Sequence, residues 1–215
     1  DTFGKPDSTN FEHFFTAANF LQYSNALRVV RAQNTSVTNA TASGSSVLIK
    51  NTDDYTNNYS TGQGSVGTFA ARTAGVHGNS LLVSTCPSAS AYEEISTSLV
   101  ASTSTTNAVG NTTIAVDEGD NFNVGDIIQF STTASTDDYD DGDFYRVTAI
   151  AGSGETLEFV QHPRGAGGLK RAVADDSKIK RRWRYYDSVD SAPGTSAWTA
   201  ERGGSGDEIH VVVVD

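Results

Sequence analysis

The chain has 215 residues, a net charge of −11 at neutral pH and a composition rich in Ser, Thr, Asn and Gly. This acidity argues against a general nucleic-acid-binding protein, because contact with phosphates depends on Lys and Arg. The single cysteine, Cys86, excludes an intramolecular disulfide framework. No apolar run approaches the length needed to span a membrane, so we expect no direct membrane insertion. From the acidity we also expect no binding of nucleic acid.

The first thirty residues carry the clearest signal of secondary structure. Thr9 and Glu12 have the spacing of a capping box, in which the threonine hydroxyl accepts from a free backbone amide and the glutamate reaches back. Apolar residues then recur at helical spacing and predict a stripe that faces one core: Phe11, Phe14, Phe15, Ala18 and Leu21. We therefore predict a helix over about 9–23, followed by a β-branched strand over 27–31.

Residues 35–68 have the composition of loops, with one short strand predicted over 47–49. Farther along, two glycines three residues apart precede an apolar segment in 75–83 and again in 203–211. A glycine loop that holds phosphate would need a lysine followed by Ser or Thr, or a third glycine that opens a helix, and neither segment has them. The pattern therefore favours a turn that leads into a strand.

Between these two segments the chain changes character. Short apolar segments lie at close spacing, separated by Gly, Asp and Ser turns, over 113–116, 126–130, 144–150 and 156–160. This spacing predicts an antiparallel β-barrel or sandwich lobe, which we place at 97–187. We predict an α+β fold that is predominantly β, in which a discontinuous mixed α/β domain, 1–96 with 188–215, carries this inserted lobe.

The acidic run from Asp137 to Asp143 suggests a calcium site, because hard cations prefer oxygen ligands. Its register does not fit an EF-hand loop. With Gly142 at the sixth position of such a loop, the third would be Tyr139 and the twelfth would be Thr148 instead of glutamate. The sequence favours a solvated hairpin loop over a cation site.

No set of residues has the spacing of a catalytic or metal site. The histidines are scattered, and no pair has the spacing of zinc ligands on one element: His13, His77, His162 and His210. No serine lies in a glycine-flanked nucleophile elbow, and Cys86 lacks the context of a thiol nucleophile. We assign no catalytic, cofactor-binding or metal-binding residue and do not expect an enzyme.

Eight of the 15 basic residues lie between Arg164 and Arg184, against two acidic residues in the same stretch. As a strand, the segment 178–186 would alternate its side chains between two faces, with Ile179, Arg181, Trp183 and Tyr185 on one and Lys180, Arg182, Arg184 and Tyr186 on the other. Aromatic residues between arginines suit stacking on single-stranded nucleic acid, and they equally suit the anchors of a protein interface. Because the rest of the chain is acidic, copies of the same protein would supply a complementary surface. We therefore predict a possible subunit interface at Lys180, Arg181, Arg182, Trp183 and Arg184.

Three segments near the N-terminus resemble a known family in order, spacing and identity. They are residues 1–6, with the sequence DTFGKP, residues 19–23, with NFLQY, and residues 27–32, with LRVVRA. Together they resemble the N-terminal α/β portion of the contractile tail sheath proteins of T-even-like myoviruses, including those that infect cyanobacteria. The segments 78–81 and 206–215 resemble glycine-turn-strand pieces of the same family, and the inserted lobe resembles its outward-facing variable domain.

The resemblance implies a structural protein of the phage tail, assembled in the host cytoplasm and needing no cofactor. Subunits would stack helically around an inner tube and then rearrange into a shorter, wider state that drives the tube through the host envelope. The implied partners are other sheath subunits, the tail tube protein, and the baseplate and tail terminator proteins. Methionine is absent and the chain ends within a predicted strand, so we expect an internal fragment, monomeric alone, without the family's terminal arms and tube-facing domain.

A second hypothesis is a surface-exposed adhesion module that binds glycans through the β lobe, because its loops and strands contain Tyr, Trp and Asn. A glycan array without hits on the isolated lobe would count against this hypothesis. The sheath hypothesis predicts instead that the helix and the 27–32 strand pack with the 79–85 and 208–214 strands in one domain, separate from the lobe.

Overall fold

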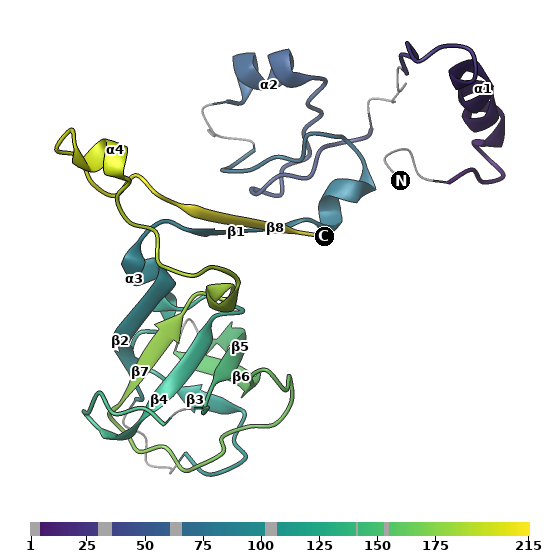
Figure 1. Cartoon of the computed structure of the whole chain (residues 1–215). Helices are drawn as coiled ribbons and strands as arrows, with labels where there is room; N and C mark the ends of the chain where they lie inside the picture. The colour runs from purple at the N-terminus through teal and green to yellow at the C-terminus, as the bar shows by residue number, and fades with distance from the viewer. Residues whose placement is uncertain (1–4, 30–35, 61–65, 102–106, 141, 153–154) are drawn as a thin grey trace. The chain divides into compact units, whose positions relative to one another are not determined.

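The computed structural model divides the chain into two compact units, residues 1–80 and residues 81–215 (Figure 1). It describes residues 5–29, 36–60, 66–101, 107–140, 142–152 and 155–215. The fold is α+β and predominantly β, as predicted, with antiparallel strands. Among the described residues, no helix has the length and apolar character needed to cross a membrane.

The first unit contains short helices joined by long connections. Its helical elements are α1 (Phe11–Leu21), α2 (Thr52–Asn58) and the 3-10 turn η1 (Val76–Ser80). A buried asparagine, Asn39, holds the connections together: its amide donates to the carbonyl of Ala71 at 2.8 Å and accepts from the backbone N–H of Ile49 at 2.8 Å. The strand predicted over 47–49 is limited to a single bridge between Asn39 and Val47.

The predicted N-terminal helix is present as α1, but its start and its environment differ from the prediction. The capping box does not form, because the Thr9 hydroxyl donates to the carboxylate of Asp7 at 2.6 Å and Asn10 occupies the N-cap position. No residue of α1 is buried, so its apolar stripe faces no core within the described residues. The strand predicted at 27–31 is wrong for residues 27–29, which have no regular structure, and the rest lies outside the described residues.

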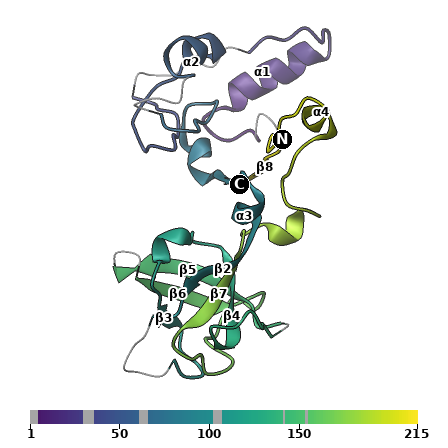
Figure 2. The same ribbon diagram turned by 90° about the vertical axis from the view of Figure 1, so that its left-hand side faces the viewer.

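The second unit is built on a six-stranded antiparallel sheet with the order β2-β7-β4-β5-β6-β3 (Figures 1 and 2). Its strands are β2 (Glu93–Leu99), β3 (Thr113–Ala115), β4 (Ile127–Ala134), β5 (Tyr145–Ala151), β6 (Thr156–Gln161) and β7 (Ser177–Arg182). The four short apolar segments predicted as strands are present as β3, β4, β5 and β6.

The sheet curls so that its two edge strands approach each other at one end (Figure 2). There the N–H of Ala101 donates to the carbonyl of Ala115, and the N–H of Asp117 donates to the carbonyl of Leu99. These bonds satisfy part of each exposed edge without closing a full barrel. The predicted lobe, 97–187, lies wholly within the second unit. Whether 1–96 and 188–215 form one domain stays a prediction.

Apolar residues from the inner face of the sheet form one core. At its centre, the rings of Phe130, Tyr145 and Phe159 pack with centroid separations of 5.2–5.7 Å. Such tilted and edge-on arrangements are favourable for aromatic pairs. Around them lie the other buried members of the core: Val100, Ile114, Val116, Phe122, Ile128, Val147, Leu157, Leu169, Val173 and Ile179.

The two predicted turn-strand segments pair with each other and form an antiparallel ribbon outside the six-stranded sheet. Its strands are β1 (Leu82–Cys86) and β8 (His210–Val214), with Leu82 opposite Val214 and Cys86 opposite His210. The turn before β8 uses Gly203 and Gly206 with positive φ, a conformation that a side chain would strain.

A second, smaller core joins this ribbon to the curled sheet. Cys86 at the end of β1, Tyr92 of α3 (Ala89–Tyr92) and Trp183 are its buried members. The Trp183 indole N–H donates to the hydroxyl of Ser84 at 2.8 Å, and the Trp183 ring stacks near His210 of β8. Trp183 therefore contacts both strands of the ribbon.

We predict that Leu157→Ala lowers the free energy of unfolding of the second unit by about 2–5 kcal/mol, because it leaves a cavity in the main core. The measurement is urea denaturation followed by tryptophan fluorescence, since Trp183 is buried in this unit. The matched control is Leu81→Ala, an exposed leucine, with an expected change near 0.5 kcal/mol or less. Equal effects of the two substitutions would contradict the assignment of the core.

Candidate functional site

The basic strip forms β7, an inner strand of the sheet between β2 and β4. Its side chains alternate as predicted: Ile179 and Arg181 are buried, whereas Lys180 and Arg182 are partly exposed on the opposite face. The strand ends at Arg182, and the chain then turns through the 3-10 element η4 (Tyr186–Ser188). The predicted alternation therefore applies only to the first part of the strip.

Carboxylates on neighbouring elements pair with the cations on the outer face of β7. Glu93 of β2 accepts from Lys180 at 2.6 Å and from Arg182 at 2.9 Å. Lys178 pairs with Asp137 of the acidic loop at 2.9 Å. Partial burial opposes ionisation of Glu93, but the hydrogen bonds from Lys180 and Arg182 outweigh it, so the pKa of Glu93 lies below its ordinary value.

Arg181 has the most enclosed charge of the strip. Its guanidinium donates to the carbonyls of Ser90 and Ala91 at 2.8 and 3.2 Å and lies 3.5 Å from Glu94 and 3.8 Å from Asp126. Burial raises the pKa of Asp126, although Arg181 and a backbone N–H favour its charged form. A cation and a carboxylate are thus taken out of water together, which costs less than burying either alone.

Arg184 differs from the other cations of the strip. Within the part of the chain that the structure describes, it makes no ion pair or hydrogen bond, and its guanidinium lies over the ring of Tyr185 at 5.2 Å. It also lies against Gly125, where φ is +101° and an added Cβ would come within 2.8 Å of the guanidinium carbon. The absence of a side chain at Gly125 therefore allows this position of Arg184.

The predicted interface residues are adjacent in space, but most of them are engaged inside the second unit. Lys180, Arg181 and Arg182 pair with acidic residues, and Trp183 is buried between the sheet and the ribbon. Arg184 is left with donors that no other described residue uses. A subunit interface at these residues stays a prediction. Of the five residues, Arg184 has the most unused hydrogen-bond donors for a partner.

Arg184 lines a pocket of about 500 Å³ between β1, α3, the loop before β4 and the end of β7. Two charged residues share its wall with Arg184, namely Asp126 and Arg181. Polar groups come from Thr85 and Asn123, and apolar surface comes from residues such as Val83, Pro87 and Val124. The volume lies in the range of small-molecule sites, and the lining combines donors, acceptors and apolar walls.

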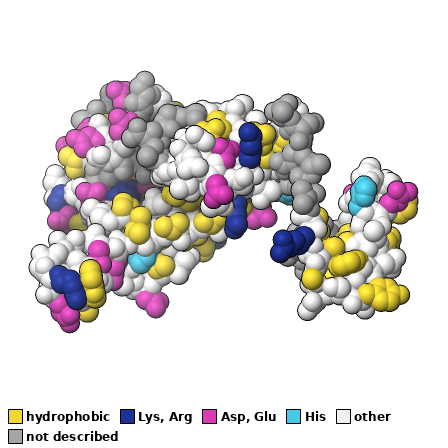
Figure 3. All heavy atoms as spheres, turned by 90° about the horizontal axis from the view of Figure 1, so that it is seen from above, with side chains coloured by type: hydrophobic (Ala, Val, Ile, Leu, Met, Phe, Trp, Pro, Cys, Tyr) yellow, Lys and Arg dark blue, Asp and Glu magenta, His cyan; other side chains and the backbone are white. Residues whose placement is uncertain are grey.

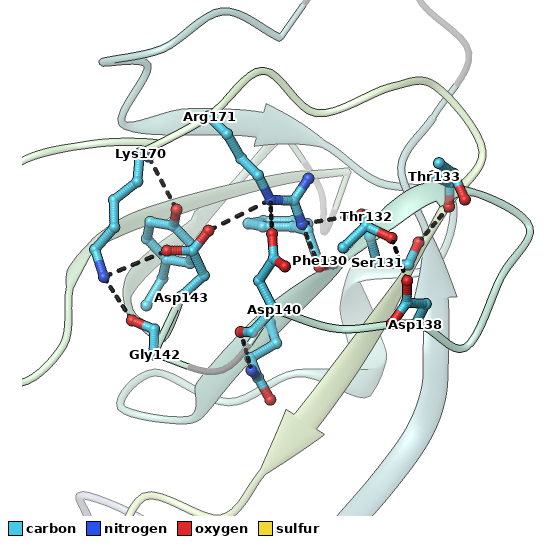
Figure 4. Close-up of polar contacts among 12 residues, drawn as sticks. Phe130, Ser131, Thr132, Thr133, Asp138, Asp140, Gly142, Asp143, Lys170 and Arg171 are labelled. Atoms are coloured by element: carbon cyan, nitrogen blue, oxygen red, sulfur yellow. Dashed lines mark hydrogen bonds and ion pairs between the residues drawn. The ribbon is translucent and has the colours of Figure 1, made fainter.

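The acidic run lies in the connection between β4 and β5, as predicted, and basic residues pair with its carboxylates (Figure 4). The Nε atom of Arg171 lies 3.3 Å from a carboxylate oxygen of Asp140 and 3.3 Å from one of Asp143, close enough for ion pairs but without hydrogen-bond geometry. Its Nη2 atom donates to the carbonyls of Phe130 and Ser131 at 2.6 and 3.0 Å.

Lys170 completes this cluster from the connection between β6 and β7, which also contains Arg171. Its ammonium lies 3.4 Å from Asp143 and donates to the carbonyl of Gly142 (Figure 4). The described carboxylates of the loop therefore have protein cations or hydroxyls as partners. Within the described residues, which omit Asp141, no three His, Cys, Asp or Glu side chains form a group that could hold a metal ion.

The chain was compared with known proteins by sequence and by structure. No family model, curated protein or solved structure matches it.

Sequence reasoning missed three residues of these clusters: Lys170, Arg171 and Asp126. The two basic residues lie inside the basic stretch from Arg164 to Arg184, and their partners lie about 30 residues earlier, so that only the fold brings them together. The signal for Asp126 was available: a single acid directly before an apolar strand predicts either a strand end or a buried charge with a partner.

We predict that Glu93→Gln lowers the free energy of unfolding at pH 7 by about 1 kcal/mol, because Lys180 and Arg182 lose their shared anion. The folded-state pKa of Glu93 lies below its ordinary value of 4.5, so its contribution is full above that value and is lost as the pH falls through the folded-state pKa. Urea denaturation at a series of pH values checks this. The difference in the free energy of unfolding between the variant and the wild type should shrink as the pH falls through the folded-state pKa of Glu93. The control Glu158→Gln, at an exposed position of β6, should differ little at any pH. A difference for Glu93→Gln that does not change with pH would contradict the role of its charge.

Proposed function

We propose that the chain is the outer part of a subunit of a contractile tail sheath from a T-even-like phage. The N-terminal segments that resemble the sheath family give the proposal its identity. The observation that carries it structurally is the uncovered apolar surface of the β1–β8 ribbon. In this proposal the protein is a component of the virion and acts through assembly, without turnover or a cofactor.

The ribbon leaves one of its faces uncovered in the second unit. Ile209, Val211 and Val213 alternate along this face and are exposed by 54%, 51% and 58%. The opposite face, with His210 and Val212, packs towards Trp183. A two-stranded ribbon is marginal alone, and exposed apolar rows on strands mark surfaces where another chain or segment packs. This is the surface expected of a protein that works inside an assembly.

The first unit contains a second uncovered apolar surface on α1. Phe11, Phe15, Phe20 and Leu21 are all exposed. At the right of Figure 3, where α1 lies in Figure 1, hydrophobic side chains form much of the visible surface. A helix with such a face is stable in a protein only when the face is buried, which supports a role with neighbouring subunits or with further parts of the same protein.

The six-stranded lobe, by contrast, has a complete core and pairs most of its basic strip internally. Such a lobe does not need neighbours for its stability, which suits a domain that projects outward from a helical sheath. The apolar ribbon and helix would then take part in subunit contacts. Contraction would proceed by exchange of one set of such contacts for another between rigid subunits.

We expect the full-length protein that contains this chain to form helical tubes under the electron microscope, and the 215-residue chain to sediment as a monomer. Replacement of the ribbon residues in Val211→Asp and Val213→Asp should abolish the tubes, because a charge would be buried at each contact. Val109→Asp, at an exposed valine of the lobe, is the control and should leave the tubes intact. A full-length protein that stays monomeric under all salt and concentration conditions would overturn the proposal.

A further inference from the structure

The pocket beside Arg184 is a site that the sheath proposal does not use. It is formed entirely within the second unit, by β1, α3, the loop before β4 and the end of β7. Two of its charged groups have incomplete hydrogen bonding. No described residue accepts a hydrogen bond from Arg184, and the Nε atom of buried Arg181 also lacks an acceptor. The Nε atom of Arg181 is itself enclosed, so the donors open to a ligand are those of Arg184. A guanidinium group offers five donors in a fixed plane, and these donors favour a ligand that is rich in oxygen.

The same wall presents an acceptor. The carboxylate of Asp126 is almost fully buried, and its Oδ2 atom accepts from the backbone N–H of Asn123 at 2.8 Å and lies 3.8 Å from Arg181. An ionised carboxylate has sites for several hydrogen bonds, more than these contacts use. Donors on a ligand, such as hydroxyl groups, would therefore find a strong acceptor beside the two arginines.

The balance of charge selects the class of ligand. Asp126 and Glu94 carry negative charge beside Arg181, and Arg181 and Arg184 carry positive charge, so the cluster is close to neutral. A strongly anionic ligand would lie beside the carboxylate of Asp126, whose pKa burial already raises. A cationic ligand would meet two guanidinium groups. A neutral compound with many hydroxyls can use both signs of charge at once.

The remaining lining suits the C–H faces of such a compound. Val83, Pro87 and Val124 give apolar surface, while Thr85 and Asn123 add further polar groups. A pocket of about 500 Å³ has room for one or two sugar rings. We propose that this pocket binds a neutral saccharide, with Asp126 accepting from its hydroxyls and Arg184 donating to them. The inference rests on these residues alone and stands whether or not the chain assembles as a sheath.

Saturation-transfer NMR on the whole 215-residue chain tests this proposal. The neutral probes are the methyl glycosides of glucose, galactose, mannose and N-acetylglucosamine, with short oligosaccharides of each to separate recognition of a free sugar from recognition of a polymer. The anionic probes are glucuronate, N-acetylneuraminate and inorganic phosphate. We expect saturable binding of at least one neutral probe, with weaker or no binding of the anions.

Variants locate the binding in this pocket. Arg184→Gln should weaken it about tenfold, because charged hydrogen bonds to the ligand are lost. Arg146→Gln, at an exposed arginine of β5 outside the pocket, should leave the affinity unchanged. Val124→Trp, at an exposed position of the wall, should abolish binding by filling the pocket, and circular dichroism checks that each variant is folded.

Three results would overturn the proposal. The first is the absence of binding by every neutral probe. The second is binding of the anionic probes alone, which would make the pocket an anion site. The third is an affinity that Arg184→Gln leaves unchanged, which would place the binding elsewhere on the chain. None of these outcomes depends on tube formation, so the saccharide and sheath proposals can fail separately.

Discussion

The second unit depends on a strand of unusual charge in the middle of its sheet. β7 carries Lys178, Lys180, Arg181 and Arg182, and it hydrogen-bonds to β2 on one side and β4 on the other. Cations at inner positions are tolerated only with partners, since an unpaired charge out of water costs several kcal/mol. Glu93, Glu94, Asp126 and Asp137 provide those partners from three other segments. The pairing agrees with the register of β2 against β7, in which Glu93 lies opposite Arg182 and Glu94 opposite Arg181, and it joins the acidic loop to β7 through Asp137.

Strands with alternating apolar residues were predictable from the sequence, and so was the existence of α1. Local hydrogen bonds were harder to predict, because neighbouring residues compete for the same donors and acceptors. Thr9 had the spacing of a capping residue, yet Asp7 is nearer and takes its hydroxyl. The apolar stripe of α1 was expected to be buried, and the described residues provide no cover for it. Periodicity predicts an apolar face but does not say which surface will cover it.

The candidate site shows the same limit at long range. The basic strip stood out in the sequence, but its partners Glu93 and Asp126 are separated from it by more than fifty residues. Composition suggested a surface that attracts acidic partners, whereas the fold provides acids from the same chain. Arg184, the last basic residue of the strip, lies beyond the end of β7 and has no carboxylate within ion-pair distance among the described residues, although its charge still favours the ionised form of Asp126. Its surroundings, including Gly125 and the pocket wall, could not be inferred without the fold.

Internal pairing of the basic strip also affects the charge of the protein surface. The chain has 26 acidic and 15 basic residues, and several of the basic ones have their charge cancelled within the sheet. Each pair cancels one acidic charge together with one basic charge, so the net charge of −11 is unchanged and comes from the acidic residues in excess. Identical lobes at close quarters would repel one another over roughly a Debye length, about 8–10 Å at physiological salt. Neighbouring lobes would therefore stay separated by a layer of water. Rising salt would screen the repulsion and shorten this separation.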